Sequence, residues 1–490
     1  MTGRMVGRGE AVGGSRILRI ELRRSSAITS AAAISACGFG LAYLLTAAFG
    51  PTPWWFAMVV NQRSIFAIVA PLTLGAGAWI ARRDRRGRAE ELLASTPRPT
   101  WSRVLPLATA LAITLTVGYV AAMAASGAAG VRPIDAYFPL GALPVIAIGA
   151  LAMVALGWLG LAIGRVLPSA FTPPLLTVVG FIALVVVPQG MAAEAETRGG
   201  IFLLIPEMQN PLFIPVAFTT ISTRVTLLQA LWFTAVAATG LALFAAASRR
   251  ARAMALAPVL VVAAVVIPLL PRLAGDMYVR DPAANAPACT EDAPTVCVNR
   301  LDANQLPDWV GPGRQALALL AAKLPPAPTR VEIYLWIAPD ATAVAGNCPP
   351  GDGCPQPVRS AEILTLELGH RGYSEAPAVL AGHHLWYLLE GAGTGRCGGQ
   401  LGPDDDTVLV EYLAARLAAA SWLIGQAPPA GFLAPEGGSN PVQRRAAEIL
   451  AELEQASVEE QAERVAALRD AERTCAPGDR TAILTGDRAS

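Results

Sequence analysis

The first half of the chain consists mainly of apolar runs that show neither the alternation of a half-buried strand nor the polar face of a surface helix. A helix needs about 20 mainly apolar residues to cross the hydrocarbon core of a bilayer. Seven runs approach this length, and none contains Asp, Glu, Lys or Arg; the fifth is short and bounded by prolines. They lie at residues 27–50, 64–81, 104–126, 138–163, 173–190, 227–247 and 253–271. The pattern predicts a polytopic α-helical membrane domain over residues 27–271.

After residue 271 the pattern becomes that of a mixed α/β domain. Residues 272–298 are rich in Pro, Ala and Asp and predict a stem, and residues 299–490 predict the folded domain. Residues 331–337 alternate as a strand does, and Ser457 with Glu460 matches a helix capping box. The expected strands are 331–337 and 362–368, and the expected helices are 313–324, 375–390, 407–424, 441–455 and 457–474.

Arginine is distributed unevenly between the predicted loops. It is concentrated in the N-terminal segment 1–26, in the loop after the second span, and in a tight turn expected at 248–252. The opposite loops carry only Arg63, Arg132, Arg198 and Arg224. Short cytoplasmic loops hold the excess of basic residues. We therefore expect a multi-pass protein of the plasma (cytoplasmic) membrane with a cytoplasmic N-terminus, seven crossings and an extracellular C-terminal domain.

The composition supports a membrane location. Hydrophobic residues make up 53% of the chain and charged residues 15%, with a mean hydropathy of +0.46, whereas soluble proteins are about 25% charged. The net charge of +1 gives no field that would attract nucleic acid.

The cysteines are concentrated in the predicted external domain. Cys37 lies in the first apolar run, and the other six follow residue 271. An even number in one domain favours disulfides, which need an oxidising compartment. Short spacings favour the pairs Cys289–Cys297 and Cys348–Cys354, leaving Cys397–Cys475. Six reduced thiols or a metal site are the alternative.

A lipoprotein signal is an alternative for the N-terminus. Ile34-Ser35-Ala36-Cys37 resembles a bacterial lipobox behind a basic segment, which would lead to cleavage before Cys37. The apolar run continues through Gly38–Phe49, where a mature lipoprotein turns polar, so we favour an uncleaved span.

The loop after the second span carries a short motif. A basic run is followed by Glu90 and then by Glu91-Leu92-Leu93-Ala94-Ser95-Thr96-Pro97, with Trp101 and Arg103 beyond it. The stretch is similar to the coupling-helix loop of type-2 ABC exporter permeases. The resemblance covers residues 16–250 and implies that Glu90, Glu91, Leu92, Leu93 and Pro97 contact a separate ATPase subunit. An amphipathic surface loop without a partner is the alternative.

A second feature fits the same family. Residues 201–220 are apolar but interrupted by Pro206, Pro211 and Pro215. The permeases have short re-entrant helices in this position, and irregular backbone at membrane depth is tolerated where it lines a cavity. Glu207 is the only ionisable residue of this stretch. It is either a pathway residue or a carboxylate among waters at the outer interface.

No phosphate-binding loop of the Gly-x-x-x-x-Gly-Lys-Ser/Thr type occurs in the sequence. The resemblance therefore implies a permease subunit that exports an unidentified substrate, works as a homodimer or heterodimer in membrane lipid, and depends on a separate ATPase.

The external domain weakly resembles a degenerate gluzincin, the zinc aminopeptidase type. That family needs His-Glu-x-x-His on one helix and a glutamate on the next. Here the helix reads His383-His384-Leu385-Trp386-Tyr387, and Glu411-Tyr412-Leu413 resembles the second segment, whose ligand position falls at Thr407 or Asp406.

Two ligands and the catalytic base of that family are altered, so we expect no metal, no cofactor and no enzymatic activity. His383 is the one matching ligand. The alternatives are a membrane-anchored metallopeptidase, a metal site formed by His370, His383, His384 and Glu390, a helix whose histidines simply pack, and a non-transporting receptor or scaffold.

Overall fold

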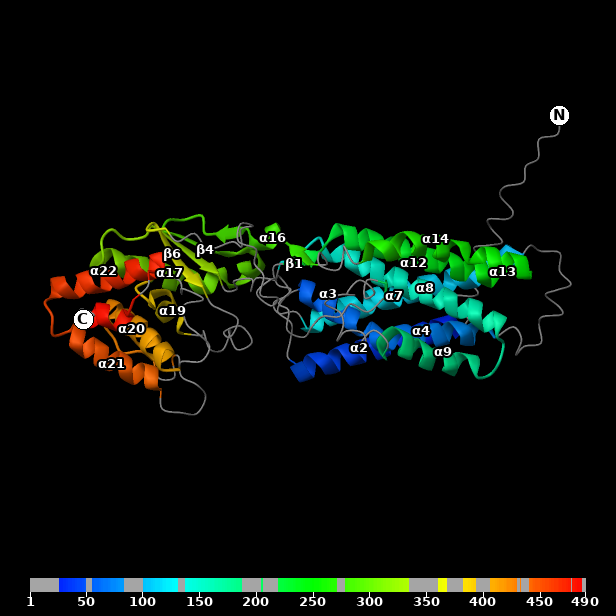
Figure 1. The fold of residues 1–490 in the computed structure, drawn as a ribbon, viewed down its shortest axis with the longest axis horizontal. Coiled ribbons are helices and arrows are strands. Elements are labelled where there is room, and N and C mark those ends of the chain that lie inside the picture. The colour runs from blue at the N-terminus through cyan, green and yellow to red at the C-terminus, as the bar shows by residue number, and fades with distance from the viewer. Residues whose placement is uncertain are drawn as a thin grey trace, which may run out of the picture. The chain divides into compact units, whose positions relative to one another are not determined.

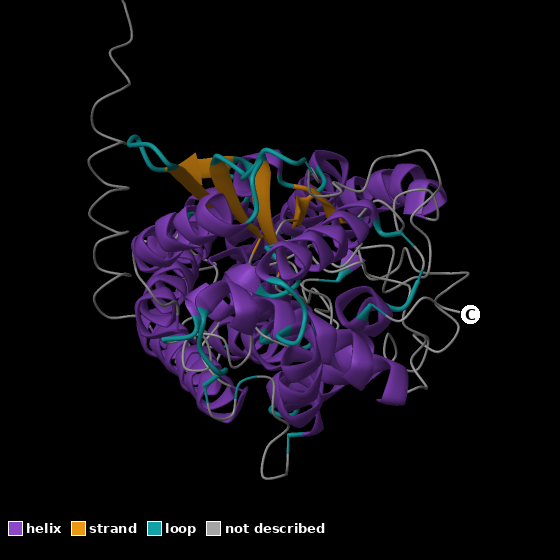
Figure 2. Ribbon diagram, turned by 90° about the vertical axis from the view of Figure 1, so that its left-hand side faces the viewer, coloured by secondary structure: helices purple, strands orange, loops and turns teal. Residues whose placement is uncertain are grey.

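The computed structural model divides the chain into two compact units, residues 1–281 and 282–490 (Figure 1). It describes residues 26–49, 55–82, 100–130, 137–186, 204–205, 219–270, 278–334, 360–367, 382–393, 406–429, 432, 440–476 and 478–486. Helices predominate over strands in these residues (Figure 2).

The first unit is a bundle of helices. They are α2 (Ser26–Phe49), α3 (Trp55–Ser64), α4 (Phe66–Ala81), α7 (Thr100–Gly130), α8 (Ala142–Val166), α9 (Thr172–Phe181), α12 (Thr223–Ala245), α13 (Arg249–Ala255) and α14 (Ala257–Val266). A π-helical turn, Ile182–Val186, extends α9, and a 3-10 turn, Ile267–Leu269, extends α14. Each predicted span falls on one of these helices, so the prediction of a helical, apolar bundle is confirmed.

Five helices in the described residues are long and apolar enough to cross a membrane: Val104–Ala128, Ala142–Val166, Thr223–Ala245, Arg249–Leu269 and Thr407–Ile424. Four of them coincide with predicted spans. The other three predicted spans contain shorter apolar helices, at Ala32–Leu41, Phe66–Ala81 and Thr172–Leu184. Thr407–Ile424 belongs to the second unit, where half of it is buried.

Glycines allow the helices around α8 to approach closely. A Cβ on Gly160 would lie 2.2 Å from the Leu74 carbonyl oxygen of α4. A Cβ on Gly240 of α12 would lie 2.7 Å from the Leu159 nitrogen of α8. Small residues at such contacts are the usual means of packing helices in lipid, where the hydrophobic effect does not drive association. Helix α8 is therefore the centre of the bundle.

The two ends of the bundle differ in chemistry. At one end, Arg82 after α4 donates to the Ala170 carbonyl at 3.5 Å, and Arg165 of α8 donates to the Phe244 carbonyl of α12 at 2.6 Å. Helix α13, with its arginines, begins four residues after α12 ends. The strands β1 (Thr219–Ile221) and β2 (Tyr278–Arg280) pair antiparallel at the opposite end of the bundle from α13 (Figure 1).

The turn between α12 and α13 is shorter than the sequence predicted. We expected a turn over 248–252, but Ser248 is the N-cap of α13, and its side chain accepts a hydrogen bond from the Ala251 backbone at 3.1 Å. The cap lets the helix begin at Arg249, so Arg249, Arg250 and Arg252 are helical residues.

The second unit contains a four-stranded sheet of order β3-β4-β5-β6. Strands β4, β5 and β6 are parallel, and β3 is antiparallel to β4. The strands are β3 (Pro287–Cys289), β4 (Thr295–Asn299), β5 (Arg330–Tyr334) and β6 (Ile363–Glu367). The strands expected at 331–337 and 362–368 are confirmed over the part that the structure describes.

The remaining elements of the second unit are helices. They are α16 (Pro282–Asn285), α17 (Leu306–Lys323), α19 (His384–Leu389), α20 (Asp406–Ile424), α21 (Pro441–Leu453), α22 (Val458–Thr474) and α23 (Arg480–Thr485), with a 3-10 segment at Arg300–Gln305. The predicted start of α17 at residue 313 is wrong. Pro312 and Gly313 read as helix breakers, but a Cβ on Gly313 would lie 3.0 Å from Val296, so this glycine lets α17 pack closely on β4.

The predicted stem is largely structured. Residues 278–280 form β2 in the first unit, and residues 287–289 and 295–299 form β3 and β4. The Pro and Asp content of 272–298 conceals the β-branched run that forms β4. The capping box is half formed: the Ser457 hydroxyl accepts from the Glu460 backbone at 3.3 Å, while the Glu460 carboxylate pairs with Arg464 at 2.5 Å.

Candidate functional site

Most residues that the sequence singled out lie outside the described residues. This applies to Glu90, Glu91, Leu92, Leu93, Pro97 and Glu207 of the permease resemblance, and to His370, Cys348, Cys354 and Cys397 of the C-terminal unit. Their assigned roles stay predictions.

The disulfide prediction is tested at two positions. Cys289 and Cys297 are bonded to each other across the β3–β4 pair, as expected. Cys475 is also in a disulfide, and its partner lies outside the part of the chain that the structure describes. Cys37 is a free, exposed cysteine.

The two described histidines lie at the start of α19, in an aromatic environment. His383 is the N-cap residue and precedes the first helical turn. The His384 ring meets the edge of Trp309, with ring centroids 4.4 Å apart, and Tyr387 packs on Phe432 at 4.7 Å. The helix expected over 375–390 thus begins, in its described part, only at His384. The structure therefore does not form a pair of metal ligands four residues apart on one helix face. His383 precedes the helix, and the position four residues later is the buried Tyr387.

The His384 ring is half-buried, and this sets its charge state. Burial lowers the pKa of His384, and the neighbouring Asp308 carboxylate opposes the shift. Burial disfavours the charged form of an imidazole, because it removes the water that would hydrate the charge. The neutral ring is therefore favoured in the folded protein.

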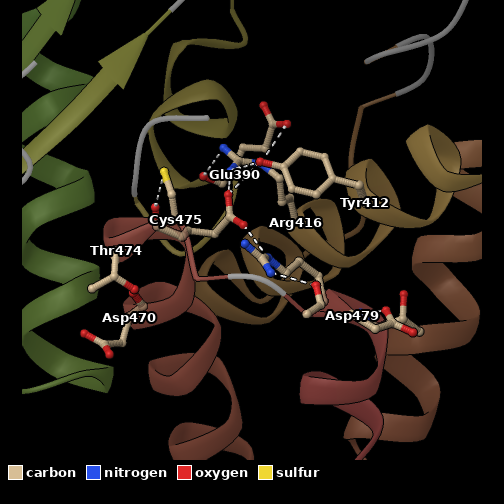
Figure 3. Close-up of polar contacts among 11 residues, drawn as sticks. Glu390, Tyr412, Arg416, Asp470, Thr474, Cys475 and Asp479 are labelled. Atoms are coloured by element: carbon tan, nitrogen blue, oxygen red, sulfur yellow. Dashed lines mark hydrogen bonds and ion pairs between the residues drawn. The ribbon is translucent and has the colours of Figure 1, made fainter. Parts of the chain in front are cut away.

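Glu390, directly after α19, belongs to a cluster of buried charged side chains (Figure 3). Arg416 of α20 lies between Glu390, which ends α19, and Glu472 of α22. Its Nε is 3.5 Å from Glu390 Oε1, and its Nη1 pairs with Glu472 Oε2. Arg480 of α23 donates to Glu472 Oε1 at 2.7 Å, and the Tyr412 hydroxyl donates to Glu472 Oε2 at 2.8 Å. We call these five side chains the Arg416 cluster.

The backbone around the Arg416 cluster is adapted to it. Gly391 has a φ of 69°, and a Cβ there would lie 2.6 Å from the Arg416 Cζ. Only glycine enters this left-handed region without a steric penalty, and here it also leaves room for the guanidinium. The Gly391 N–H donates to the Arg416 carbonyl at 3.2 Å, which ties the end of α19 to α20.

The Arg416 cluster is electrostatically balanced, with two guanidinium groups and two carboxylates. Burial opposes ionisation of Arg416, but Glu390, Tyr412 and Glu472 more than offset it, so the pKa of Arg416 is raised. Both Glu472 oxygens accept from donors. This geometry joins α19, α20, α22 and α23.

The second gluzincin-like segment is also engaged in ion pairs. Glu411 Oε1 pairs with Arg445 at 2.8 Å, and its Oε2 accepts from the Thr481 hydroxyl at 2.9 Å. Thr407, in the ligand position of that resemblance, is exposed. Within the described ranges, no three His, Cys, Asp or Glu side chains gather as a metal site would require.

Sequence reasoning missed the Arg416 cluster and misplaced Arg63. The signal for the cluster was present, because Arg416 is the only charged residue in the apolar stretch 413–424. Arg63 was expected in an outer loop. It lies instead in α3, with 0% of its surface exposed. It donates to the Val145 carbonyl of α8 at 3.1 Å and lies over the Phe66 ring.

No protein-family model, no curated protein and no solved structure matches this chain. The functional assignment therefore depends on the residues and geometry described above.

Proposed function

We propose that the chain is the permease subunit of a type-2 ABC exporter, which moves an unidentified substrate outward with a separate ATPase subunit. Its bundle lies in the plasma membrane, as a homodimer or heterodimer, and its C-terminal unit is extracellular. The observation that carries the proposal is the segregation of the two bundle ends described above.

The arginine-bearing end is the one from which the motif loop leaves. Arg82 ends α4 at this end, and residues 83–99 connect it to α7. Trp158, in the C-terminal half of α8, donates to the Ala108 carbonyl near the start of α7 at 2.9 Å. The start of α7 is therefore level with the end of α8 and with Arg165. This geometry supports a cytoplasmic position for the Glu91–Pro97 segment, where an ATPase subunit would dock.

The opposite end is the one from which the chain continues into the second unit. Strand β2 pairs there with β1, and the Tyr137 hydroxyl is 3.3 Å from the Asp281 carboxylate. The C-terminal unit, with its Cys289–Cys297 disulfide, thus follows the end that carries few arginines. Disulfides persist in oxidising compartments, and this agrees with an extracellular location.

Labelling of intact cells tests the topology. In a Cys37→Ser background, which keeps the six C-terminal cysteines, a membrane-impermeant maleimide should label Arg300→Cys and should not label Arg250→Cys. The opposite pattern contradicts the proposed orientation.

Co-purification tests the permease assignment. An ATPase should co-purify with the wild-type chain, and Leu92→Arg should abolish this while the membrane level is unchanged. Leu140→Arg makes the same change at an exposed position before α8 and should retain the ATPase. If no ATPase accompanies the wild type, or if Leu92→Arg with Glu91→Arg retains it, the assignment is wrong and a receptor or scaffold role takes its place.

We further propose that the C-terminal unit is not a peptidase. The packing of Tyr387 on Phe432 and the ion pairs of Glu390 and Glu411 support this. Zinc hydrolases need three protein ligands and an open position for water. Elemental analysis of the full chain should find no stoichiometric zinc. One zinc per chain, lost together with peptide hydrolysis in His383→Ala, would promote the metallopeptidase alternative.

A further inference from the structure

We infer that α13 and the outer face of α14 form a binding site for an anionic phospholipid. In this site the arginines of α13 hold the phosphate, and α14 lies along the acyl chains. The inference requires the bundle to lie in a bilayer and is independent of what the protein transports.

The three arginines of α13 form an exposed patch of positive charge. Arg249, Arg250 and Arg252 are exposed and lie within four residues. Among the described residues no acidic side chain pairs with any of the three, and the sequence contains no Asp or Glu from residue 208 to residue 275. Two other arginines at this end whose side chains the structure describes, Arg165 and Arg82, differ because they donate to backbone carbonyls. Among the residues that the structure describes, this patch of positive charge is therefore not neutralised by an ion pair.

An exposed apolar face continues directly from this charge. Met254, Leu260 and Val261 are 70%, 62% and 63% exposed, and the face extends through Val265. On its inner side α14 packs against α12, where the Val259 N–H donates to the Thr239 hydroxyl at 3.1 Å. Apolar surface of this extent needs a cover other than water.

Charge and apolar surface together match one kind of ligand. A phospholipid presents a phosphate at the level where its acyl chains begin, and the chain from Arg249 to Leu269 presents guanidinium groups followed by an apolar helix. Arginine binds phosphate through two parallel N–H donors, which lysine does not match. The side chains carry the site, and the backbone of the short α13 is not required. Basic groups beside a membrane helix are attracted to anionic headgroups.

The test uses the full chain purified in a neutral detergent. Phosphatidylglycerol should raise its unfolding temperature, since a ligand that binds only the folded state stabilises it. Phosphatidylcholine with the same acyl chains should raise it less. Glycerol phosphate, which lacks acyl chains, should have no effect. The phosphatidylglycerol effect should weaken with added salt.

Substitutions test whether phosphatidylglycerol binds at α13. The triple change Arg249→Gln, Arg250→Gln and Arg252→Gln should weaken the apparent phosphatidylglycerol affinity by roughly tenfold or more. The control, Arg300→Gln, Arg314→Gln and Arg444→Gln, removes the same charge from the second unit and should leave the affinity unchanged. If the glutamine variant does not fold, the triple lysine variant should fold and bind more weakly than wild type. Unchanged affinity in the α13 variants, or equal responses to phosphatidylcholine or glycerol phosphate, overturns the inference.

Discussion

Arg416 and Glu472 form an ion pair in which the side chains are 2% and 0% exposed, although 56 residues separate them in the sequence. Two charges removed from water are stable only when paired and hydrogen-bonded. Arg480, Tyr412 and Glu390 meet this condition by supplying the remaining donors and acceptors. The pair therefore ties α20 to α22.

Removal of Arg416 should destabilise the C-terminal unit strongly. Arg416→Met leaves Glu390 and Glu472 buried without their common partner, and breaking such a pair costs about 3–5 kcal/mol. Chemical denaturation of the full chain, followed by near-UV circular dichroism, measures the loss.

Arg445→Ala is the control for this prediction, because it removes a partly exposed ion pair with Glu411. Pairs of this kind contribute about 0–1 kcal/mol. Equal effects of the two changes would show that burial of the Arg416 cluster has no energetic consequence.

The C-terminal unit should lose stability in mild acid through His384. Its pKa in the folded protein is lowered by burial, so the unfolded chain binds the proton more readily. The stabilising contribution is complete above the unfolded pKa of about 6.5 and is lost as pH falls below it. Unfolding temperatures at pH 7.5 and pH 5.5 should differ less in His384→Phe than in wild type.

Asp308→Asn checks the sign of this effect. The Asp308 carboxylate raises the pKa of His384 and so opposes the larger effect of burial. Its removal should make the loss of stability in acid steeper. If the stability of Asp308→Asn depended less on pH than that of wild type, the electrostatic account would be wrong.

Sequence reasoning succeeded where one local property determines the structure. Apolar length located the helices of the bundle other than α3, and short spacing located the Cys289–Cys297 disulfide. It failed where contacts between residues far apart in the sequence determine the structure. Arg63 reads as a loop residue because only its packing against Val145 reveals that it is buried. The Arg416 cluster draws its acidic residues from positions 26 and 56 residues away, and no periodicity of the chain encodes that distance.

The contact between α4 and α8 should not tolerate a side chain at Gly160. A Cβ there would approach the Leu74 carbonyl oxygen and Gly77, both of which are backbone and cannot rotate away. Overpacking of this kind costs about 1–3 kcal/mol. Gly160→Ala should therefore lower the unfolding temperature in detergent, measured by size-exclusion chromatography after heating.

Gly40→Ala provides the matched control. It makes the same substitution in α2, where nothing lies within 4 Å of the added Cβ. This variant should be as stable as wild type or more stable. A loss equal to that of Gly160→Ala would contradict the packing account, because helix propensity by itself favours alanine over glycine.

Loss of the Cys289–Cys297 disulfide should destabilise the second unit moderately. The bond closes a loop with a sequence separation of 8 residues, for which chain entropy predicts about 2.5 kcal/mol. The double change Cys289→Ser and Cys297→Ser should lower the denaturation midpoint accordingly. Cys37→Ser, which removes an exposed thiol, should change it by less than about 0.5 kcal/mol.

The pairing of β1 with β2 has a mechanical consequence. Only Asp281 separates the end of β2 from the start of α16 at Pro282, and its carboxylate is itself in contact with Tyr137. Strand β1, in turn, ends two residues before α12 begins. A displacement of the first turn of α12 would therefore be transmitted through the paired strands to Asp281, the last residue of the first unit.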